Sequence, residues 1–327
     1  MTEGGGPAVA AISLGAAQHE SAPAKLNLFL HVLGRRESGH HLLDSLVAFT
    51  DLGDALAAGA PNAGDPDAIT LDVEGPFGTA LARDAGDRNL VLRAARLLRK
   101  ETGVTRGCHL RLLKRLPLAA GLGGGSADAA AALRALARFW GLDLPRDRFE
   151  AIALSLGADV PACFASRPAR MGGIGERLTS MQLPETGVVL ANPGTPLSTA
   201  AVFEAYARLR EERSASYRRP LAMIPAFADV HTFAEWLDQG TDNDLTEAAV
   251  RLEPAIADAL IALSEMPGAL MVRMSGSGAT CFALFPDAES AAGGARWLAG
   301  RRPQWWIAAT ALVPALDRPL PGEVEPD

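Results

Sequence analysis

The sequence predicts an α+β protein of two domains, and three observations lead to this expectation. The chain has 327 residues, which is enough for two domains of ordinary size. Segments with the period of strands are interspersed with segments with the period of helices, without the regular alternation that builds a parallel sheet. A glycine-rich stretch at 171–175 separates the two halves. We therefore expect a loose extension over 1–21, an N-terminal domain over 22–175 and a C-terminal domain over 176–327.

Composition excludes several classes of function. The formal net charge is −7 and no dense cluster of Lys and Arg occurs, which argues against a nucleic-acid surface. No apolar run reaches the roughly 18 residues that a membrane span needs. The N-terminal stretch has no Lys or Arg before Lys25, unlike a signal peptide. Cys108, Cys163 and Cys281 are too far apart to suggest a disulfide framework or a zinc site, so we expect a cytoplasmic protein.

The N-terminal domain begins with a strand over 22–32, in which apolar and polar side chains alternate. Lys25 and Asn27 lie on its polar face, which is either a solvated sheet face or part of a site. A turn with two adjacent histidines, His40 and His41, follows, and loop histidines are often ordinary surface residues. Further strands are expected at 47–57, 69–73 and 108–113, and helices from 89 to 103 and from about 148 to 156.

The stretch 116–140, LPLAAGLGGGSADAAAALRALARFW, joins a glycine loop to an amphipathic helix. Glycines at 121 and 123–125 can bring backbone N–H groups close to a ligand, and the first turn of a helix leaves its N–H groups free and partly positive. This arrangement predicts a phosphate site. The alternative is a simple turn before an alanine-rich packing helix. Neither a Walker loop nor a dinucleotide fingerprint fits, since no Lys-Ser or Lys-Thr pair follows and position 126 is Ser.

Asp159 follows the shorter helix, between small residues and a proline. It is either a turn residue or a functional carboxylate at the edge of a core. Beyond it, a strand is expected at 188–191, a helix at 200–209, a polar linker at 211–220, helices within 232–264, and strands at 269–274, 280–285 and 305–312. The loop at 275–278, Ser-Gly-Ser-Gly, can also bring backbone amides close to a ligand.

Three stretches, PAKLNLFLHVLGRRESGHH at 23–41, LPLAAGLGGGSADAAAAL at 116–133 and MSGSGATCFALF at 274–285, resemble the three ordered motifs of the GHMP small-molecule kinases. The resemblance spans 22 to about 312. It implies the two-domain GHMP kinase fold, with a deep cleft between the domains where ATP and a small polyol meet. The turn ending in His41 and the segment LGADVP most resemble members that phosphorylate the 2-hydroxyl of a methylerythritol bearing a cytidine diphosphate, on the non-mevalonate route to isoprenoids.

The resemblance also implies roles for individual residues. Lys25 and Asp159 would be the catalytic pair, and the hydroxyl of Ser126 would help to hold Mg²⁺ beside the ATP phosphates. The nucleotide would be bound by Pro117, Ala119, Ala120, Gly121, Leu122, Gly123, Gly124, Gly125 and Ser126. The substrate would be bound by Asn27, His40, His41, Phe203, Gly276, Ser277 and Gly278.

The chain departs from the family pattern at His40, where relatives typically have Tyr, and at Arg170 and Gly172, where they more often have Phe and Glu. We expect stacking of the cytosine ring on Phe203 and on the imidazole of His40. A monomer or weak homodimer without nucleic-acid or membrane partners is expected. One alternative is another GHMP kinase, acting on mevalonate, homoserine or a sugar. A second is a non-catalytic ligand sensor, although such a protein would be expected to have lost Lys25 or Asp159.

Overall fold

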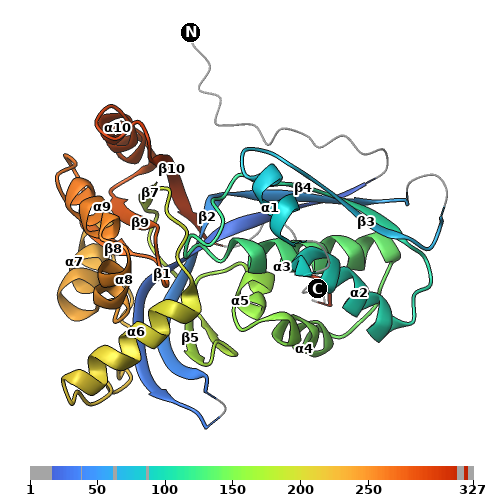
Figure 1. Ribbon diagram of the computed structural model, residues 1–327, viewed down its shortest axis with the longest axis horizontal. Coiled ribbons are helices and arrows are strands. Elements are labelled where there is room, and N and C mark those ends of the chain that lie inside the picture. Colours follow the sequence, from blue (N-terminus) through green and yellow to red (C-terminus); the bar gives the residue numbers. More distant parts are fainter. Residues whose placement is uncertain (1–16, 38, 62–64, 86–87, 315–319, 323–327) are drawn as a thin grey trace.

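A long antiparallel pair of strands organises the molecule. The computed structural model describes residues 17–37, 39–61, 65–85, 88–314 and 320–322. Strand β1 (Gln18–Arg35) pairs with β2 (His41–Gly59), and irregularities in their register let the pair bend. Figure 1 shows this pair passing through both halves of the molecule. The strand therefore begins at Gln18 rather than at residue 22, and the rest of the expected extension, 1–16, lies outside the described residues.

The N-terminal half is completed by short strands and a layer of helices. Strand β4 (Cys108–Leu113) pairs antiparallel with β2 and parallel with β3 (Ile69–Glu74). The helices are α1 (Gly78–Ala85), α2 (Leu90–Thr102), α3 (Gly124–Trp140), α4 (Arg146–Leu156) and α5 (Val160–Ala165). The sequence analysis missed α1 and α5.

The first three residues of the glycine-rich stretch at 171–175 belong to a strand that the sequence analysis did not expect. Strand β5 (Ala169–Gly173) pairs with β2 on one side and with β6 (Arg177–Ser180) on the other. Ala169, Met171 and Gly173 are buried while the residues between them are half-buried, so the stretch has the period of a strand. Its glycines had obscured that period.

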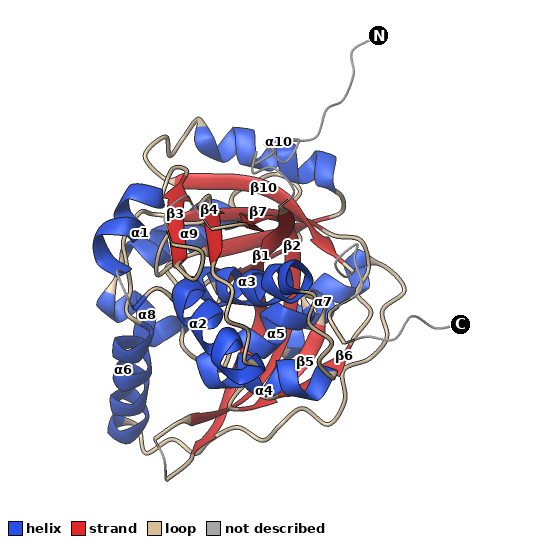
Figure 2. Cartoon of the chain, turned by 90° about the vertical axis from the view of Figure 1, so that its right-hand side faces the viewer, coloured by secondary structure: helices blue, strands red, loops and turns tan. Residues whose placement is uncertain are grey.

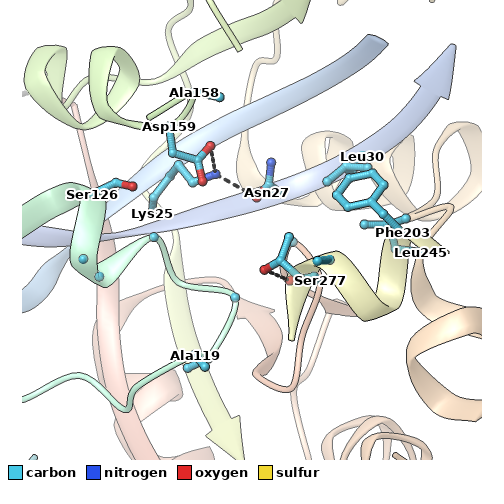
Figure 3. Close-up of a pocket in the computed structure, with 18 of the residues that line it drawn as sticks. Lys25, Asn27, Leu30, Ala119, Ser126, Ala158, Asp159, Phe203, Leu245 and Ser277 are labelled. Atoms are coloured by element: carbon cyan, nitrogen blue, oxygen red, sulfur yellow. Dashed lines mark hydrogen bonds and ion pairs between the residues drawn. The ribbon is translucent and has the colours of Figure 1, made fainter. Parts of the chain in front are cut away.

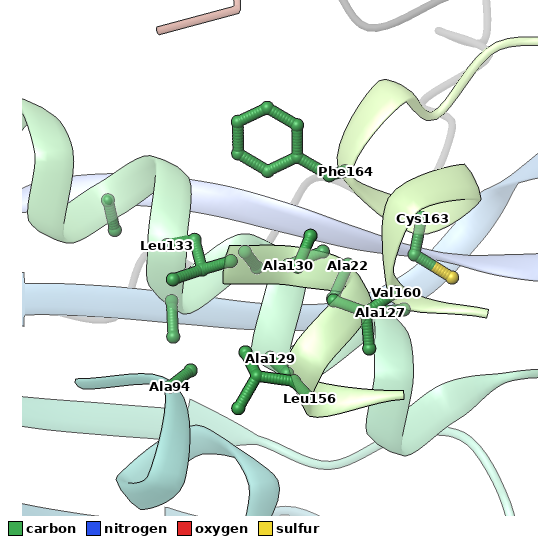
Figure 4. Close-up of a cluster of buried hydrophobic side chains, with 14 of the residues drawn as sticks. Ala22, Ala94, Ala127, Ala129, Ala130, Leu133, Leu156, Val160, Cys163 and Phe164 are labelled. Carbon is green, nitrogen blue, oxygen red and sulfur yellow. The ribbon is translucent and has the colours of Figure 1, made fainter. Parts of the chain in front are cut away.

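Small side chains explain why α3 lies at the centre of the N-terminal half. Alanine is its commonest residue, and the helix is buried from Ala127 to Ala137. Figure 4 shows Ala127, Ala129 and Ala130 packed against side chains of neighbouring segments, among them Val160 and Leu156. Alanine lets the backbones approach closely, so α3 is held firmly against the sheet.

The C-terminal half has its own antiparallel sheet in the order β10-β7-β9-β8. Its strands are β7 (Gly187–Asn192), β8 (Met271–Met274), β9 (Cys281–Phe285) and β10 (Trp306–Val313). Its helices are α6 (Thr199–Glu212), α7 (Val230–Gly240), α8 (Thr246–Leu252), α9 (Ala255–Ser264) and α10 (Ala288–Ala299). Helix α10, which the sequence analysis also missed, packs over β10 and β7 (Figure 2).

The two sheets join through β10 and β2, where Leu312 is opposite Thr50 and Val313 is opposite Phe49. The α+β expectation is confirmed, and the two halves share one continuous sheet. None of the helices in the described part of the chain combines the length and the apolar character needed to span a bilayer.

Candidate active site

A cavity of about 1090 Å³ lies where the three sequence motifs meet. Its wall takes Lys25 and Asn27 from β1, the glycine loop before α3, Asp159 before α5, and Gly276 and Ser277 from the loop between β8 and β9. Figure 3 shows Lys25 and Asp159 pointing toward each other, with Ser126 on one side of them and Phe203 on the other. Side chains that lie far apart in the sequence therefore surround one space.

Lys25 and Asp159 form an ion pair in this wall. Lys25 Nζ donates to Asp159 Oδ1 at 2.9 Å and to Asn27 Oδ1 at 3.1 Å. The lysine side chain is 3% exposed and the aspartate side chain is 40% exposed, so the carboxylate faces the cavity while the ammonium lies behind it. Asp159 stands at the N-cap position of α5, but its side chain makes no capping hydrogen bond. An ion-paired carboxylate that faces the cavity does not fit the alternative in which Asp159 is only a turn residue.

The glycine loop is tied to the same strand. The backbone N–H of Lys25 donates to the carbonyl of Leu122 at 2.9 Å. Gly123 has φ 63° and occupies the N-cap position of α3, a 17-residue helix. The free N–H groups of the first turn of α3 therefore lie beside the Lys25–Asp159 ion pair, where an anion would be stabilised.

The loop after β8 packs directly on the glycine loop. Ser275 Oγ accepts from the N–H of Asn27 at 3.2 Å and donates to the carbonyl of Gly121 at 3.0 Å. Gly121 has φ 75°, and a Cβ there would come within 2.4 Å of the Ser275 carbonyl oxygen. The sequence analysis included Ser275 in the loop at 275–278 but did not count it among the site residues.

Most predicted site residues line the cavity, but two do not. Leu122 is buried and contributes only its carbonyl to Lys25, and Gly278 lies against Met274 and Ile256 instead of the cavity. The remaining predicted residues are all in the wall: Asn27, His40, His41, Pro117, Ala119, Ala120, Gly121, Gly123, Gly124, Gly125, Ser126, Phe203, Gly276 and Ser277.

His41 and Phe203 close one end of the cavity. Their rings stack with centroids 4.6 Å apart and planes 22° apart. Burial lowers the pKa of His41, and the nearby charges of Arg35 and Arg210 lower it further, so the imidazole is neutral at pH 7. Its Nε2 atom is buried and has no hydrogen-bond partner among the described residues. His40 is exposed, and the aromatic partner of Phe203 is His41 instead.

A buried charge cluster that the sequence analysis missed lies behind the glycine loop. Lys114 Nζ donates to Asp54 Oδ2 at 2.5 Å and to Asp128 Oδ2 at 2.7 Å. Burial raises the pKa of Asp128 to about 8, because Lys114 offsets only part of that effect and the carboxylate of Asp54 adds to it. Burial alone would lower the pKa of Lys114, but the two carboxylates raise it. The sequence does contain a sign of this cluster, because Asp54 and Asp128 each interrupt a run of small and apolar residues.

Comparisons with known proteins agree with this geometry. The family model described as the GHMP kinases N terminal domain matches residues 89–167, and the model described as GHMP kinases C terminal matches 223–297. A protein of Gluconacetobacter diazotrophicus named 4-diphosphocytidyl-2-C-methyl-D-erythritol kinase is 49% identical over 300 residues, which cover 90% of this chain and 94% of the relative. A protein of Ruegeria pomeroyi with the same name is 50% identical over 291 residues, covering 88% and 96% of the two chains.

Solved structures give the same result. A crystal structure of 4-(cytidine 5'-diphospho)-2C-methyl-D-erythritol kinase aligns with a TM-score of 0.72 at 34% identity, covering 90% of this chain and 98% of that one. Homoserine kinase from Cytophaga hutchinsonii aligns with a TM-score of 0.64 over 95% of this chain and 97% of that one, but at 17% identity it shows the fold alone. The chain therefore belongs to the GHMP kinase family.

Proposed function

We propose that the chain transfers the γ-phosphoryl group of ATP to the 2-hydroxyl group of 4-diphosphocytidyl-2-C-methyl-D-erythritol, in the non-mevalonate route to isoprenoid precursors. The observation that carries the proposal is the Lys25–Asp159 pair, which lies in the cavity wall beside the free N–H groups of α3. Relatives that are 45–50% identical over nearly their whole length carry the name of this kinase.

The catalytic roles follow from charge and position. Phosphoryl transfer has a loose transition state, so the protein acts mainly by positioning groups and stabilising charge. The N–H groups of Gly124, Gly125 and Ser126 would hold the phosphates at the start of α3. Asp159 would accept the proton of the attacking hydroxyl, since its carboxylate reaches the cavity without a capping bond. Lys25 would orient that carboxylate and attract the transferred group.

Mg²⁺ would accompany ATP, and the residues present suit it. Protein sites for Mg²⁺ typically offer one or two oxygen ligands and leave the rest to phosphates and water. The hydroxyl of Ser126, in the cavity wall at the start of α3, would be such a ligand. The described residues contain no cluster of three or more His, Cys, Asp and Glu that could hold an ion by themselves. When bound, the ion would neutralise charge on the phosphates.

The cytosine end of the substrate would be bound at His41 and Phe203. The neutral imidazole leaves a buried ring nitrogen free for a hydrogen bond to the edge of the base. The edges of the stacked His41 and Phe203 rings and the loop Gly39–His41 would form the surface around the cytosine ring. Asn27 and Ser277 lie between this end and the glycine loop, in the part of the wall that would face the polyol (Figure 3).

We further propose that the enzyme works in the cytoplasm as a monomer or weak homodimer, without nucleic-acid or membrane partners. The three cysteines, Cys108, Cys163 and Cys281, are free and buried, which suits a reducing compartment. Size-exclusion chromatography with light scattering across protein concentrations tests the oligomeric state.

A coupled assay of ADP release tests the substrate. The purified chain is given ATP with 4-diphosphocytidyl-2-C-methyl-D-erythritol, mevalonate or homoserine in parallel. Turnover of the first compound alone is the expected result, and its product should carry the new phosphate at the 2-hydroxyl by phosphorus NMR. Preference for mevalonate or homoserine would assign the chain to a different activity within the same family.

A further inference from the structure

Strand β1 carries one extra residue beside the cavity. Its register with β2 shifts between Asn27 and Phe29, which leaves Leu28 without a partner on β2. Bulges of this kind redirect the side chains beside them and release backbone groups from the ladder. Arg273 Nη1 donates to the carbonyl of Leu28 at 2.7 Å, and Ser45 Oγ donates to the carbonyl of Phe29 at 2.5 Å. Side chains from two other strands, β8 and β2, therefore hold the bulge.

The hydrogen bonds of Ser45 can run in only one direction. A backbone carbonyl only accepts, so the single hydroxyl hydrogen of Ser45 goes to Phe29. The oxygen of Ser45 is then left to accept, and it accepts from Nδ2 of Asn27 at 2.8 Å. The amide of Asn27 is thereby turned with its nitrogen toward Ser45 and its oxygen toward Lys25.

The orientation of this amide decides how Lys25 is held. An ammonium group has three N–H donors and no acceptor, so it needs the oxygen of the Asn27 amide and is repelled by the nitrogen. Lys25 Nζ donates to Asn27 Oδ1 at 3.1 Å and to Asp159 Oδ1 at 2.9 Å (Figure 3). Because the group is tetrahedral, two fixed donors also fix the direction of the third. Lys25 lines the cavity, and the third donor is the one left for the transferred phosphoryl group.

We propose that Ser45 is a positioning residue for phosphoryl transfer, which acts through Asn27 to hold the ammonium group of Lys25 in its reactive direction. The assignment rests on the proposed kinase function, because it requires the catalytic role of Lys25. Ser45 is 0% exposed and does not line the cavity, so it touches neither substrate. A small misplacement of a group at the reacting atoms can lower the rate about 100-fold. The role therefore predicts an effect on turnover with little effect on substrate affinity.

Steady-state kinetics of a set of variants tests this role. Ser45→Ala removes the hydroxyl, and Ser45→Thr keeps it on a residue that suits a strand. Asn27→Ala removes the linking amide, and it is made alone and together with Ser45→Ala. Thr50→Val is the matched control, because Thr50 is equally buried on β2, donates to the carbonyl of Leu52 at 2.7 Å and does not line the cavity. If Ser45→Ala does not fold, Ser45→Cys takes its place, since a thiol has nearly the same size and forms weaker hydrogen bonds.

Ser45→Ala is expected to lower kcat by about 10- to 100-fold, with the KM values of ATP and of the cytidine-bearing substrate changed by less than about 3-fold. Ser45→Thr should keep kcat within about 3-fold of the wild type, because threonine offers the same donor and acceptor. In the Asn27→Ala background, removing the hydroxyl should have almost no further effect on kcat, since residues that act in series are not additive. Thr50→Val should leave kcat and KM unchanged.

The side-chain amide of Asn27 gives a second readout that does not depend on turnover. In NMR spectra its NH₂ hydrogens should exchange with solvent at least about 10-fold faster in Ser45→Ala than in the wild type and in Thr50→Val, because a buried hydrogen bond is lost. Equal exchange rates would overturn the assignment, since Ser45 would then not hold the amide.

The kinetics can overturn it in two further ways. A wild-type kcat in Ser45→Ala would show that the direction of the ammonium group does not depend on Ser45. An equal loss of kcat on removing the hydroxyl with and without the Asn27 amide would mean that Ser45 only stabilises β1. Wild-type protein that fails to phosphorylate the cytidine-bearing substrate would refute the kinase function itself, and this result is distinguished because it precedes any comparison of variants.

Discussion

At the scale of single residues, burial decides what the polar face of β1 can do. Lys25 and Asn27 are 3% and 1% exposed, so the interpretation as a solvated sheet face is wrong. Asn27 Nδ2 donates to Ser45 Oγ at 2.8 Å, which leaves its Oδ1 to accept from Lys25. The asparagine therefore fixes the ammonium from one side and Asp159 fixes it from the other. A buried lysine held in this way has little freedom, as a positioned catalytic group requires.

Replacing Asp159 by asparagine removes the proposed base and keeps its shape. We expect turnover to fall by about 10² or more, the usual scale for loss of a general base, with much smaller changes in nucleotide affinity. Steady-state kinetics and calorimetry measure the two quantities. Asp143→Asn, which neutralises an exposed carboxylate outside the cavity, is the control and should behave as the wild type. Near-normal turnover in Asp159→Asn would show that Asp159 is not a general base and that the enzyme acts by positioning its substrates alone.

His41→Ala and Phe203→Ala test recognition of the cytosine. Because the two rings stack on each other, we expect both variants to weaken binding of the cytidine-bearing substrate, by roughly 1–3 kcal/mol if stacking compares with that in nucleic-acid complexes. The preference for this substrate over methylerythritol phosphate should decrease in both. Leu154→Ala, at an exposed position on α4, is a control for the loss of apolar surface. Wild-type affinity and preference in both variants would place the base elsewhere.

At the scale of elements, the glycine loop and α3 work as one unit. Gly121 and Gly123 have positive φ angles of 75° and 63°, which side chains rarely adopt, so these two positions set the turn. The glycines at 124 and 125 lie inside α3 and serve a different purpose, since they leave space around the first N–H groups. That space differs between them. A Cβ on Gly124 would come within 3.0 Å of Lys114 Nζ, so a substitution there would also disturb the buried charge cluster.

Gly125→Val is therefore the cleaner test of the phosphate site. The added Cβ would meet only the Leu90 side chain at 3.5 Å, and the residue is exposed, so the fold should persist. Close approach of the phosphates should be blocked, and we expect ATP affinity to fall by at least about 10-fold in calorimetry, because charge-assisted bonds to the backbone are lost. Gly293→Val makes the same change in α10, away from the cavity, and should leave affinity unchanged. Unchanged affinity in Gly125→Val would contradict the placement of the phosphates.

At the scale of the whole molecule, a few buried polar contacts join distant segments. Arg134 of α3 is 0% exposed and donates to Glu20 of β1 at 2.9 Å and to the carbonyls of Ser21, Cys163 and Phe164. Ser275 joins the C-terminal half to both Asn27 and the glycine loop. The cavity therefore depends on contacts that hold α3, β1 and the second loop together.

Removing the charge of Glu20 should weaken the whole fold. Glu20→Gln leaves the guanidinium of Arg134 buried without its carboxylate, a change that typically costs about 3–5 kcal/mol. Denaturant unfolding measures the loss. Glu204→Gln breaks an exposed ion pair with Arg208 on α6 and should cost less than about 1 kcal/mol. Equal small effects in both variants would show that the first residues of β1 add little to stability.

The sequence alone determined the local features of this protein. Spacing of apolar residues and the caps at Asn89 and Gly103 fixed α2, and the glycine loop with its alanine-rich helix predicted an anion site, because local geometry and side-chain size depend on neighbouring residues. The three ordered motifs indicated the family. Only the tertiary structure decided which of these features meet. The family resemblance had paired Lys25 with Asp159, 134 residues away, but their hydrogen bond and the burial of the lysine came from the structure, as did the charge cluster of Lys114, Asp54 and Asp128 behind the loop. Burial and pairing depend on how the strands and helices pack, and no local pattern carries that information.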